Sequence, residues 1–211
     1  MSGRGKFISF EGGEGAGKST QARKLKAALE ARGREVVLTR EPGGSPGAEE
    51  IRKLLVEGAP ERWTPLSETL LFIAARADHV ARVIEPALSA GKWVISDRFS
   101  DSTFVYQGVA RGLGLDAVRR LHDAAIPNFA PDLTLILDLD PAEGLKRASV
   151  RSGTAENRFE KFDADFHSRL RAGFRDIAAK EPVRCAVIDG GAAADTVAVD
   201  VLRNVVERLR L

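Results

Sequence analysis

The sequence predicts an α/β fold with a doubly wound parallel sheet, and two observations lead to this class. Short apolar runs alternate with longer segments of helical periodicity, and most of the short runs are continuous rather than alternating. Strands covered by helices on both faces have continuous apolar runs, whereas strands with one face in water alternate apolar and polar residues. A length of 211 residues suits one domain of this class. We therefore expect a single domain over residues 1–211.

Five short apolar segments are the predicted strands: residues 7–10, 35–39, 93–96, 133–137 and 185–188. Residues 19–31 carry apolar side chains on one helical face and are followed by Gly33, a typical helix C-cap. Residues 66–90 form a long, mostly apolar helical pattern, which Pro86 should kink or divide. Residues 195–209 repeat valine and leucine at helical spacing. The irregular segment 151–158 is expected to be a mobile surface loop.

The composition disfavours several classes of protein. Hydrophobic residues make up 44% and charged residues 29%, and the formal net charge of +2 is too small to predict a nucleic-acid partner held by bulk charge. No apolar stretch reaches the ~20 residues of a membrane span, and the apolar run near the N-terminus is too short for a secretory signal. Cys185 is the single cysteine, which excludes an internal disulfide and predicts a buried thiol. We expect a cytoplasmic protein with no nucleic-acid or membrane partner.

A glycine-rich loop between the first strand and the first helix is the strongest functional signal. Gly12, Gly17, Lys18 and Ser19 match the pattern G-x-x-x-x-G-K-[ST] in full. Glycines let successive backbone N–H groups turn toward a polyphosphate, and the helix N-terminus adds positive potential there. Lys18 is expected to reach the β- and γ-phosphates, and Ser19 is expected to offer an oxygen to Mg²⁺. The residues expected to bind the nucleoside triphosphate here, ATP or GTP, are Gly12, Gly13, Glu14, Gly15, Ala16, Gly17, Lys18, Ser19 and Thr20.

Two other nucleotide-binding classes fit the sequence less well. The dinucleotide fingerprint G-x-G-x-x-G fails because Glu14 and Lys18 occupy positions that require glycine. A GTPase switch is disfavoured because the guanine-recognition pattern Asn/Thr-Lys-x-Asp is missing and no Asp-x-x-Gly follows the loop. The loop alone therefore predicts nucleoside triphosphate binding without deciding between a kinase, a motor and a switch.

Charged and aromatic residues near other strand ends indicate a second phosphate. Asp97 ends the third strand and can hold Mg²⁺ through water. Arg98 beside it can bind a phosphate through two parallel hydrogen bonds. Arg40 follows the second strand and is placed to meet an anion at the same edge. Phe72 and Arg76 are four residues apart on one helical face, where a ring can stack on a base and a guanidinium can donate to its carbonyls.

The ordered motifs "FEGGEGAGKST", "TREPGGSP", "LLFIAARADH", "ISDRFSDSTFVYQG" and "LDLDP" resemble those of the thymidylate kinase family over nearly the whole chain. The resemblance implies a P-loop nucleoside monophosphate kinase-like fold, with five parallel strands, helices on both faces and a short lid at about residues 147–160. It also implies a homodimer. The implied activity is transfer of the γ-phosphoryl of ATP to dTMP, giving dTDP for dTTP synthesis and DNA replication, with Mg²⁺ as cofactor.

The resemblance also assigns roles to individual residues. Phe72 would stack on thymine, Tyr106 would lie under the deoxyribose, and Asp97 would act near Mg²⁺. The residues implied to bind dTMP are Glu14, Arg40, Phe72, Arg76, Arg98, Ser102, Thr103, Tyr106 and Gln107. Members of the family have a basic residue either inside the phosphate loop, as an arginine, or in the lid. This chain has Gly15 at the loop position, so it resembles the form with basic lid residues. The lid arginines are Arg147, expected at ATP, and Arg151 and Arg158, expected to be catalytic with Lys18, Asp97 and Arg98.

Several interpretations stay open at this point. Phe104 and Val105 depart from the family pattern, which leaves uncertain which neighbouring side chain touches the base. Glu11 is expected to support either Mg²⁺ or a loop amide. His79, His122 and His167 lack metal or triad spacing and are expected to pack or to face solvent. Alternative functions are another P-loop nucleotide kinase, acting on dCMP, UMP or a deoxynucleoside, and an ATP-dependent regulatory switch.

Overall fold

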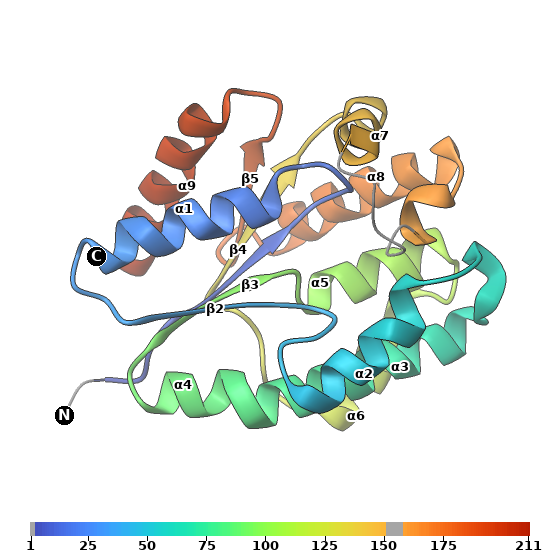
Figure 1. Cartoon of the computed structure of the whole chain (residues 1–211), viewed down its shortest axis with the longest axis horizontal. Helices are drawn as coiled ribbons and strands as arrows, with labels where there is room; N and C mark the ends of the chain where they lie inside the picture. The colour runs from blue at the N-terminus through green and yellow to red at the C-terminus, as the bar shows by residue number, and fades with distance from the viewer. Residues whose placement is uncertain (1–2, 151–157) are drawn as a thin grey trace.

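The computed structural model describes residues 3–150 and 158–211, and it contains one parallel sheet. The strand order is β2-β3-β1-β4-β5, and every described pair of neighbours is parallel (Figure 1). The strands are β1 (Phe7–Glu11), β2 (Val36–Arg40), β3 (Trp93–Asp97), β4 (Leu133–Asp138) and β5 (Cys185–Asp189). The predicted strands are therefore confirmed, each to within a residue at either end.

The register brings the chemistry to one edge of the sheet. Asp97 at the end of β3 pairs with Phe10 of β1 on one side and with Arg40 of β2 on the other. The glycine loop leaves the central strand one residue later, after Glu11. Since all the strands are parallel, their carboxyl ends meet at this edge, where open α/β sheets bind ligands.

Helices cover both faces of the sheet. Helices α1 (Lys18–Glu30) and α9 (Ala194–Leu209) lie side by side on one face, where their apolar side chains pack on β1, β3, β4 and β5 (Figure 1). The opposite face carries α3 (Pro65–His79), α4 (Glu85–Ser89), α6 (Leu115–Ala125) and α8 (Ala164–Lys180). Helix α2 (Pro46–Val56) packs on α3, and α7 (Pro141–Val150) follows β4.

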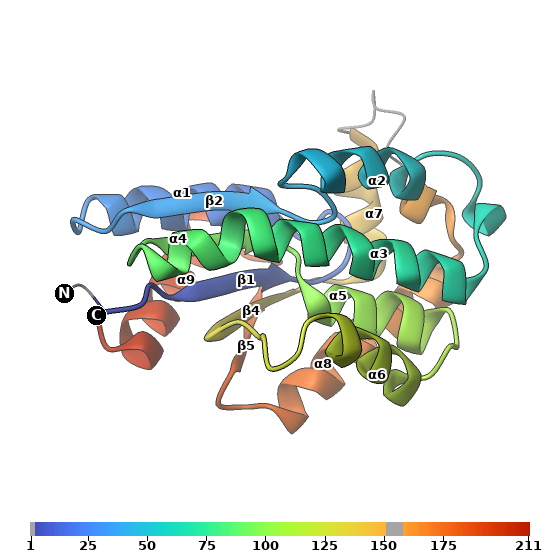
Figure 2. The same ribbon diagram turned by 90° about the horizontal axis from the view of Figure 1, so that it is seen from below.

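The predicted effect of Pro86 takes the form of a π-helical turn. Helix α3, the π turn η2 (Val80–Ile84) and α4 follow one another without a break, so Figure 2 shows one long rod. The backbone N–H of Glu85 bonds to the carbonyl of Val80, five residues earlier. Because proline has no N–H, the regular ladder cannot continue through Pro86, and the wider turn absorbs this defect.

A second π turn builds part of the site. Helix α5 (Ser100–Thr103) continues into η3 (Phe104–Ala110), and both lie between β3 and α6. Phe104 and Val105 are buried in the core between η3, α6 and α8, away from solvent. These two departures from the family pattern are therefore packing residues.

The expected lid segment is partly helical. Residues 147–150 are the last turn of α7, and residues 158–160 belong to the 3₁₀ turn η4 (Arg158–Lys161). The prediction of a surface loop is wrong at its last residue, because Arg158 is fully buried. Arg151 and the rest of the loop lie outside the described residues. The lid assignment itself stays a prediction.

Other expectations concern residues away from the sheet edge. Cys185 is a free, buried cysteine, and burial raises its pKa to about 12. The three histidines are buried, so the packing interpretation is confirmed, and no group of three metal-ligating side chains was found among the described residues. Within the same part of the chain, no helix combines the length and apolar character needed to cross a membrane. The short turn η1 (Pro60–Arg62) links α2 to α3.

Candidate active site

The glycine loop is fitted tightly against β4 and α7. Gly12 and Gly15 both have positive φ angles, 132° and 67°. A Cβ atom on Gly12 would lie 2.5 Å from the carbonyl oxygen of Leu137, and one on Gly15 would lie 1.9 Å from that of Gly144. Glycine is thus required at both positions by conformation and by space. This backbone also excludes an arginine side chain at position 15.

Lys18 begins helix α1 and extends back over the loop. Its Nζ donates to the carbonyl oxygens of Gly12, at 3.1 Å, and Gly13, at 2.6 Å. Burial and the positive charge of Arg98 lower the pKa of Lys18 to about 8. An ammonium group in this position can exchange carbonyl contacts for phosphate oxygens, which would restore its preference for the charged form.

Ser19 and Asp97 meet at the floor of the site. The Ser19 hydroxyl donates to Oδ2 of Asp97, joining the first turn of α1 to the end of β3. Both residues present hard oxygen ligands, which Mg²⁺ prefers, and Mg²⁺ in phosphate sites uses few protein ligands. The donor set therefore fits the expected Mg²⁺, although these two residues alone form no protein cage.

Arg98 adopts a left-handed backbone conformation, with φ of 72°, and turns its side chain toward the loop. Its Nη1 donates to the Gly12 carbonyl and to the Ser102 hydroxyl, both at 3.0 Å. Its Nη2 donates to Oε1 of Glu14 at 2.8 Å. The guanidinium also lies over the Tyr106 ring, 5.0 Å from the centroid. Arg98 therefore connects the glycine loop to the segment after β3.

Glu14 is the carboxylate at the centre of these contacts. Burial opposes its ionisation, but Arg98 and Lys18 together lower its pKa to about 2. The Tyr106 hydroxyl donates to the same Glu14 oxygen at 2.6 Å, and burial raises the pKa of that phenol well above 10.0. At neutral pH the site therefore contains an ionised Glu14 and a protonated Tyr106.

Glu11 supports the turn that carries Arg98. Its carboxylate accepts from the backbone N–H of Phe99 at 2.8 Å and from the Ser102 hydroxyl at 2.5 Å. Burial and the nearby Asp101 carboxylate raise the pKa of Glu11 to about 8. Of the two roles that the sequence left open for Glu11, the structure supports the loop amide.

Arg76 is held at the other end of the same cavity. Its Nε donates to Oε2 of Glu41 at 2.7 Å, and its Nη2 donates to the Phe99 carbonyl and the Thr103 hydroxyl at 3.1 and 2.9 Å. Its Nη1 is buried and has no hydrogen-bond acceptor among the described residues. The second Glu41 oxygen is 3.0 Å from Nδ1 of His79. Glu41 therefore fixes the guanidinium so that one edge can serve a ligand.

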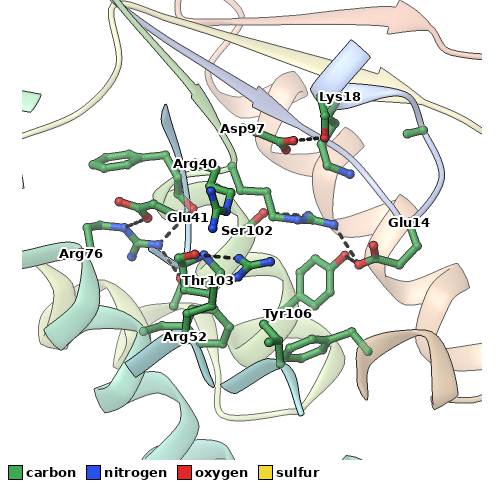
Figure 3. Close-up of a pocket in the computed structure, with 18 of the residues that line it drawn as sticks. Glu14, Lys18, Arg40, Glu41, Arg52, Arg76, Asp97, Ser102, Thr103 and Tyr106 are labelled. Atoms are coloured by element: carbon green, nitrogen blue, oxygen red, sulfur yellow. Dashed lines mark hydrogen bonds and ion pairs between the residues drawn. The ribbon is translucent and has the colours of Figure 1, made fainter. Parts of the chain in front are cut away.

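One cavity of about 240 Å³ unites these groups. In Figure 3, Lys18 and Glu14 lie at one end, and Arg76 and Glu41 lie at the other. The predicted residues that line it are Glu14, Gly15, Ala16, Gly17, Lys18, Ser19, Arg40, Phe72, Arg76, Asp97, Arg98, Ser102, Thr103, Tyr106 and Gln107. All nine residues expected to bind the acceptor are therefore brought together, although they come from four segments of the chain. Gly12, Gly13 and Thr20 do not line it.

The cavity also contains residues that the sequence did not single out. They are Glu41, Pro42, Arg52, Val56, Phe99, Phe159 and Glu160. Glu41 lies in the "TREPGG" motif, so its position next to Arg40 was an available signal. Arg52 lies on α2 and resembles any surface arginine in sequence, and no pattern marked Phe159.

The two described lid arginines, Arg147 and Arg158, do not line this cavity. Arg147 pairs with Glu143 at 3.0 Å and donates to the Gly190 carbonyl at 3.0 Å. Gly190 itself approaches the glycine loop, since a Cβ atom there would lie 3.4 Å from the Ala16 carbonyl oxygen. Arg158 lies in none of the described hollows and is fully buried beside Glu68.

The fold and the site define the class of protein. A phosphate-binding loop after the central parallel strand, with an arginine-rich acceptor cavity at the same edge, describes a P-loop phosphotransferase of the small-molecule kinase type. The family model for thymidylate kinase matches residues 10–200. The chain belongs to the thymidylate kinase family.

Similar proteins cover nearly the whole chain. It is 54% identical over 209 residues to the thymidylate kinase of Ruegeria pomeroyi, covering 99% of this chain and 98% of that protein. It is 53% identical over 208 residues to the thymidylate kinase of Caulobacter vibrioides, with 99% of each covered. The crystal structure of thymidylate kinase from Ehrlichia chaffeensis superposes with a TM-score of 0.77 at 38% identity, covering 95% of this chain and 98% of that one.

Proposed function

We propose that this chain is a dTMP kinase, which transfers the γ-phosphoryl group of ATP to dTMP and releases dTDP and ADP. The observation that carries the proposal is one cavity lined by Lys18 of the phosphate loop, Arg98, Arg76 and Phe72. Figure 3 shows Lys18 at one end of it and Arg76 at the other. Two phosphates can meet between Lys18 and Arg98 while a base fills the other end. Membership of the thymidylate kinase family supports the same activity.

The acceptor is expected to bind through all three of its parts. Arg98 and Arg40 would hold the dTMP phosphate, and Tyr106 with Glu14 would face the sugar. Phe72 would stack on the base. The remaining N–H groups on Nη1 of Arg76 can only donate, so they favour a carbonyl of thymine over the amino group of cytosine at the same position. Ser102, Thr103 and Gln107 complete this acceptor set.

The chemistry needs positioning more than proton transfer. A phosphate monoester is already anionic at neutral pH, so no strong base is required to expose its oxygen. Backbone N–H groups of the loop and the Lys18 ammonium would hold the γ-phosphoryl, while Arg98 aims the acceptor oxygen in line with it. Fixed positive groups stabilise the charge of the transition state without reorganising. Arg147 is proposed at the ATP side, and the catalytic role of Arg151 stays a prediction.

We also propose Mg²⁺ as the cofactor. Ser19 would ligate it and Asp97 would hold it through water, and the ion would neutralise charge on the β- and γ-phosphates. Removing divalent cations with a chelator should abolish turnover, and adding Mg²⁺ should restore it. Full turnover in the chelator would contradict this part of the proposal.

The cellular setting follows from the family resemblance. We propose a homodimer in the cytoplasm that supplies dTDP for dTTP synthesis and DNA replication. Sedimentation of the purified chain at micromolar concentration tests the dimer directly. A monomer at all concentrations would refute that proposal without affecting the proposed reaction.

A coupled ADP-release assay tests the reaction. Purified chain, ATP and Mg²⁺ are combined in turn with dTMP, dUMP, dCMP and UMP, and dTMP should give the highest kcat/KM. Preference for dCMP or UMP would point to another nucleotide kinase. Slow hydrolysis of ATP that dTMP does not change would instead indicate a regulatory switch.

A further inference from the structure

Glu68 is a fully buried carboxylate on α3 that no step of the proposed reaction uses. Its Oε1 accepts from Nε2 of Gln107 at 2.8 Å, and its Oε2 lies 2.5 Å from Nη1 of Arg158. Nε of Arg111 is 3.7 Å from Oε1. A buried carboxylate is expensive unless it is paired, so the contacts on both oxygens are needed to keep it in place.

All three nitrogens of the Arg158 side chain donate hydrogen bonds to backbone carbonyls. Nε donates to the Ala59 carbonyl at 2.9 Å, Nη1 to the Leu55 carbonyl at 3.2 Å, and Nη2 to the Pro60 carbonyl at 2.5 Å. The side chain is fully buried. Arg158 therefore fastens η4 to the end of α2 and the turn that follows it, and it would have to leave these acceptors in order to reach a phosphate.

Glu68 is linked to two walls of the acceptor cavity, one directly through Gln107 and one through Arg158, the residue before Phe159. Gln107 lines the cavity from η3, and Phe159 lines it from η4, directly after Arg158. The Phe159 ring packs 6.1 Å from the Phe72 ring and 5.5 Å from the Tyr106 ring, centroid to centroid. Arg158 thus anchors the turn η4, which carries Phe159 against these two rings.

The carboxylate also sets the orientation of the Gln107 amide. A carboxylate only accepts hydrogen bonds, so the NH₂ group of Gln107 must face Glu68. The amide oxygen, Oε1 of Gln107, is then buried without a donor among the described residues. A neutral amide at position 68 would lose this constraint and would also present N–H groups to the Arg158 guanidinium.

We propose that Glu68 is a positioning residue of the acceptor pocket, which holds Gln107 with one oxygen and, through Arg158, the Phe159 wall with the other. The inference rests on the proposed binding of dTMP in this cavity. It gives Arg158 a role at the nucleoside end of the cavity, in place of the charge-stabilising role that the sequence predicted. Glu68 and Arg158 then act as one unit.

Steady-state kinetics of Glu68→Gln, Arg158→Met and the double variant test the proposal. Each single variant should raise the KM for dTMP by about tenfold while kcat and the KM for ATP change by less than about threefold, since ground-state positioning of one substrate is lost. The KM for dTMP of the double variant should be about that of the poorer single variant. Either single substitution already breaks the contact between Glu68 and Arg158, so the second one has no further contact of this pair to remove.

Two control variants separate positioning from general effects. Arg203→Met removes an exposed arginine of α9 that pairs with Asp200, and its kinetics should match the wild type. Val201→Ala removes buried methyl groups from α9, on the opposite face of the sheet, so it lowers stability without touching the pocket. All assays are run well below the melting temperature of each variant.

Three results would overturn the inference. Arg158→Met could lower kcat about a hundredfold with an unchanged KM for dTMP, the signature of a group acting on the transferred phosphoryl. The fold-changes in KM of the two single variants could multiply in the double variant. Val201→Ala could also raise the KM for dTMP as much as Glu68→Gln does. A wild-type chain that neither binds nor phosphorylates dTMP would overturn the proposed function first, so the two failures are distinguishable.

Discussion

The hydroxyl of Tyr106 donates to Oε1 of Glu14 at 2.6 Å, and Nη2 of Arg98 donates to the same oxygen at 2.8 Å. One carboxylate therefore joins the glycine loop, the segment after β3 and the π turn η3. Arg98 is held in a defined orientation before any substrate arrives, and its remaining donor capacity faces the cavity that Lys18 lines. Enzymes that transfer phosphoryl groups lower the activation barrier mainly through such preorganised charges, which stabilise the transition state.

Replacing Arg98 tests its role in orienting the acceptor. Arg98→Ala should lower turnover by at least about a hundredfold, the scale for losing one charge-stabilising donor. Arg98→Lys should recover only part of this loss, because an ammonium is a point charge and cannot give two parallel hydrogen bonds. The measurement is kcat with saturating ATP and dTMP. Near-normal turnover of Arg98→Ala would remove Arg98 from the site.

Replacing Lys18 tests the phosphate loop. Lys18→Ala should lower turnover by at least about a hundredfold, because the transferred group loses its closest fixed positive charge. The matched control is Lys24→Ala on the outer face of α1, where the lysine pairs with Asp195. That variant should retain wild-type kinetics. Equal activity of the two variants would contradict a phosphate-binding role for the loop.

Much of the fold was predictable because local patterns and tertiary structure agree. The five continuous apolar runs became five parallel strands, and the glycine loop lies after the first of them, as the spacing predicted. The acceptor residues were predictable only by combining chemistry with the family resemblance. Phe72 and Arg76 share a helical face in sequence, but the hydrogen bond from Arg76 to Thr103 depends on a tertiary contact between α3 and α5.

The burial of Arg158 and Glu68 was not predictable, because it depends on long-range contacts that leave no local sequence pattern. Arg158 was expected to be a catalytic arginine in a surface lid loop, but the backbone carbonyls at residues 55, 59 and 60 and the carboxylate of Glu68 bury it. Glu68 itself lies in the first turn of α3, where an acidic residue normally faces water. Burial of such charges is decided by a partner about 90 residues away, a separation over which sequence periodicity carries no information.

Tyr106→Phe tests the sugar end of the cavity with little change in shape. The variant removes the hydroxyl that donates to Glu14 but keeps the ring under the Arg98 guanidinium. The KM for dTMP should rise by about three- to tenfold, since a hydrogen bond to a charged group is lost, while kcat should fall less. An unchanged KM would show that the phenol does not help to fix Glu14 for the sugar.

Glu14→Gln tests the electrostatics through the pH dependence of stability. The folded-state pKa of Glu14 is lowered to about 2 from the model-compound value of 4.5, so the unfolded chain takes up this proton first as the pH falls. The stability due to the ionised group is therefore fully present above about pH 5.5 and is lost as the pH falls toward 2. By pH 3.5 about 1.4 kcal/mol of it should be gone.

The measurement is urea unfolding of the wild type and of Glu14→Gln at several pH values between 7 and 3.5. Other carboxylates titrate equally in both proteins, so the difference between their free energies of unfolding isolates position 14. Because the glutamine does not titrate, the stability advantage of the wild type should stay constant down to about pH 5.5 and shrink by about 1.4 kcal/mol at pH 3.5. A difference that stays constant over the whole range would mean that Arg98 and Lys18 do not favour the ionised form of Glu14, and a difference that grows toward acid would mean that burial dominates and raises its pKa.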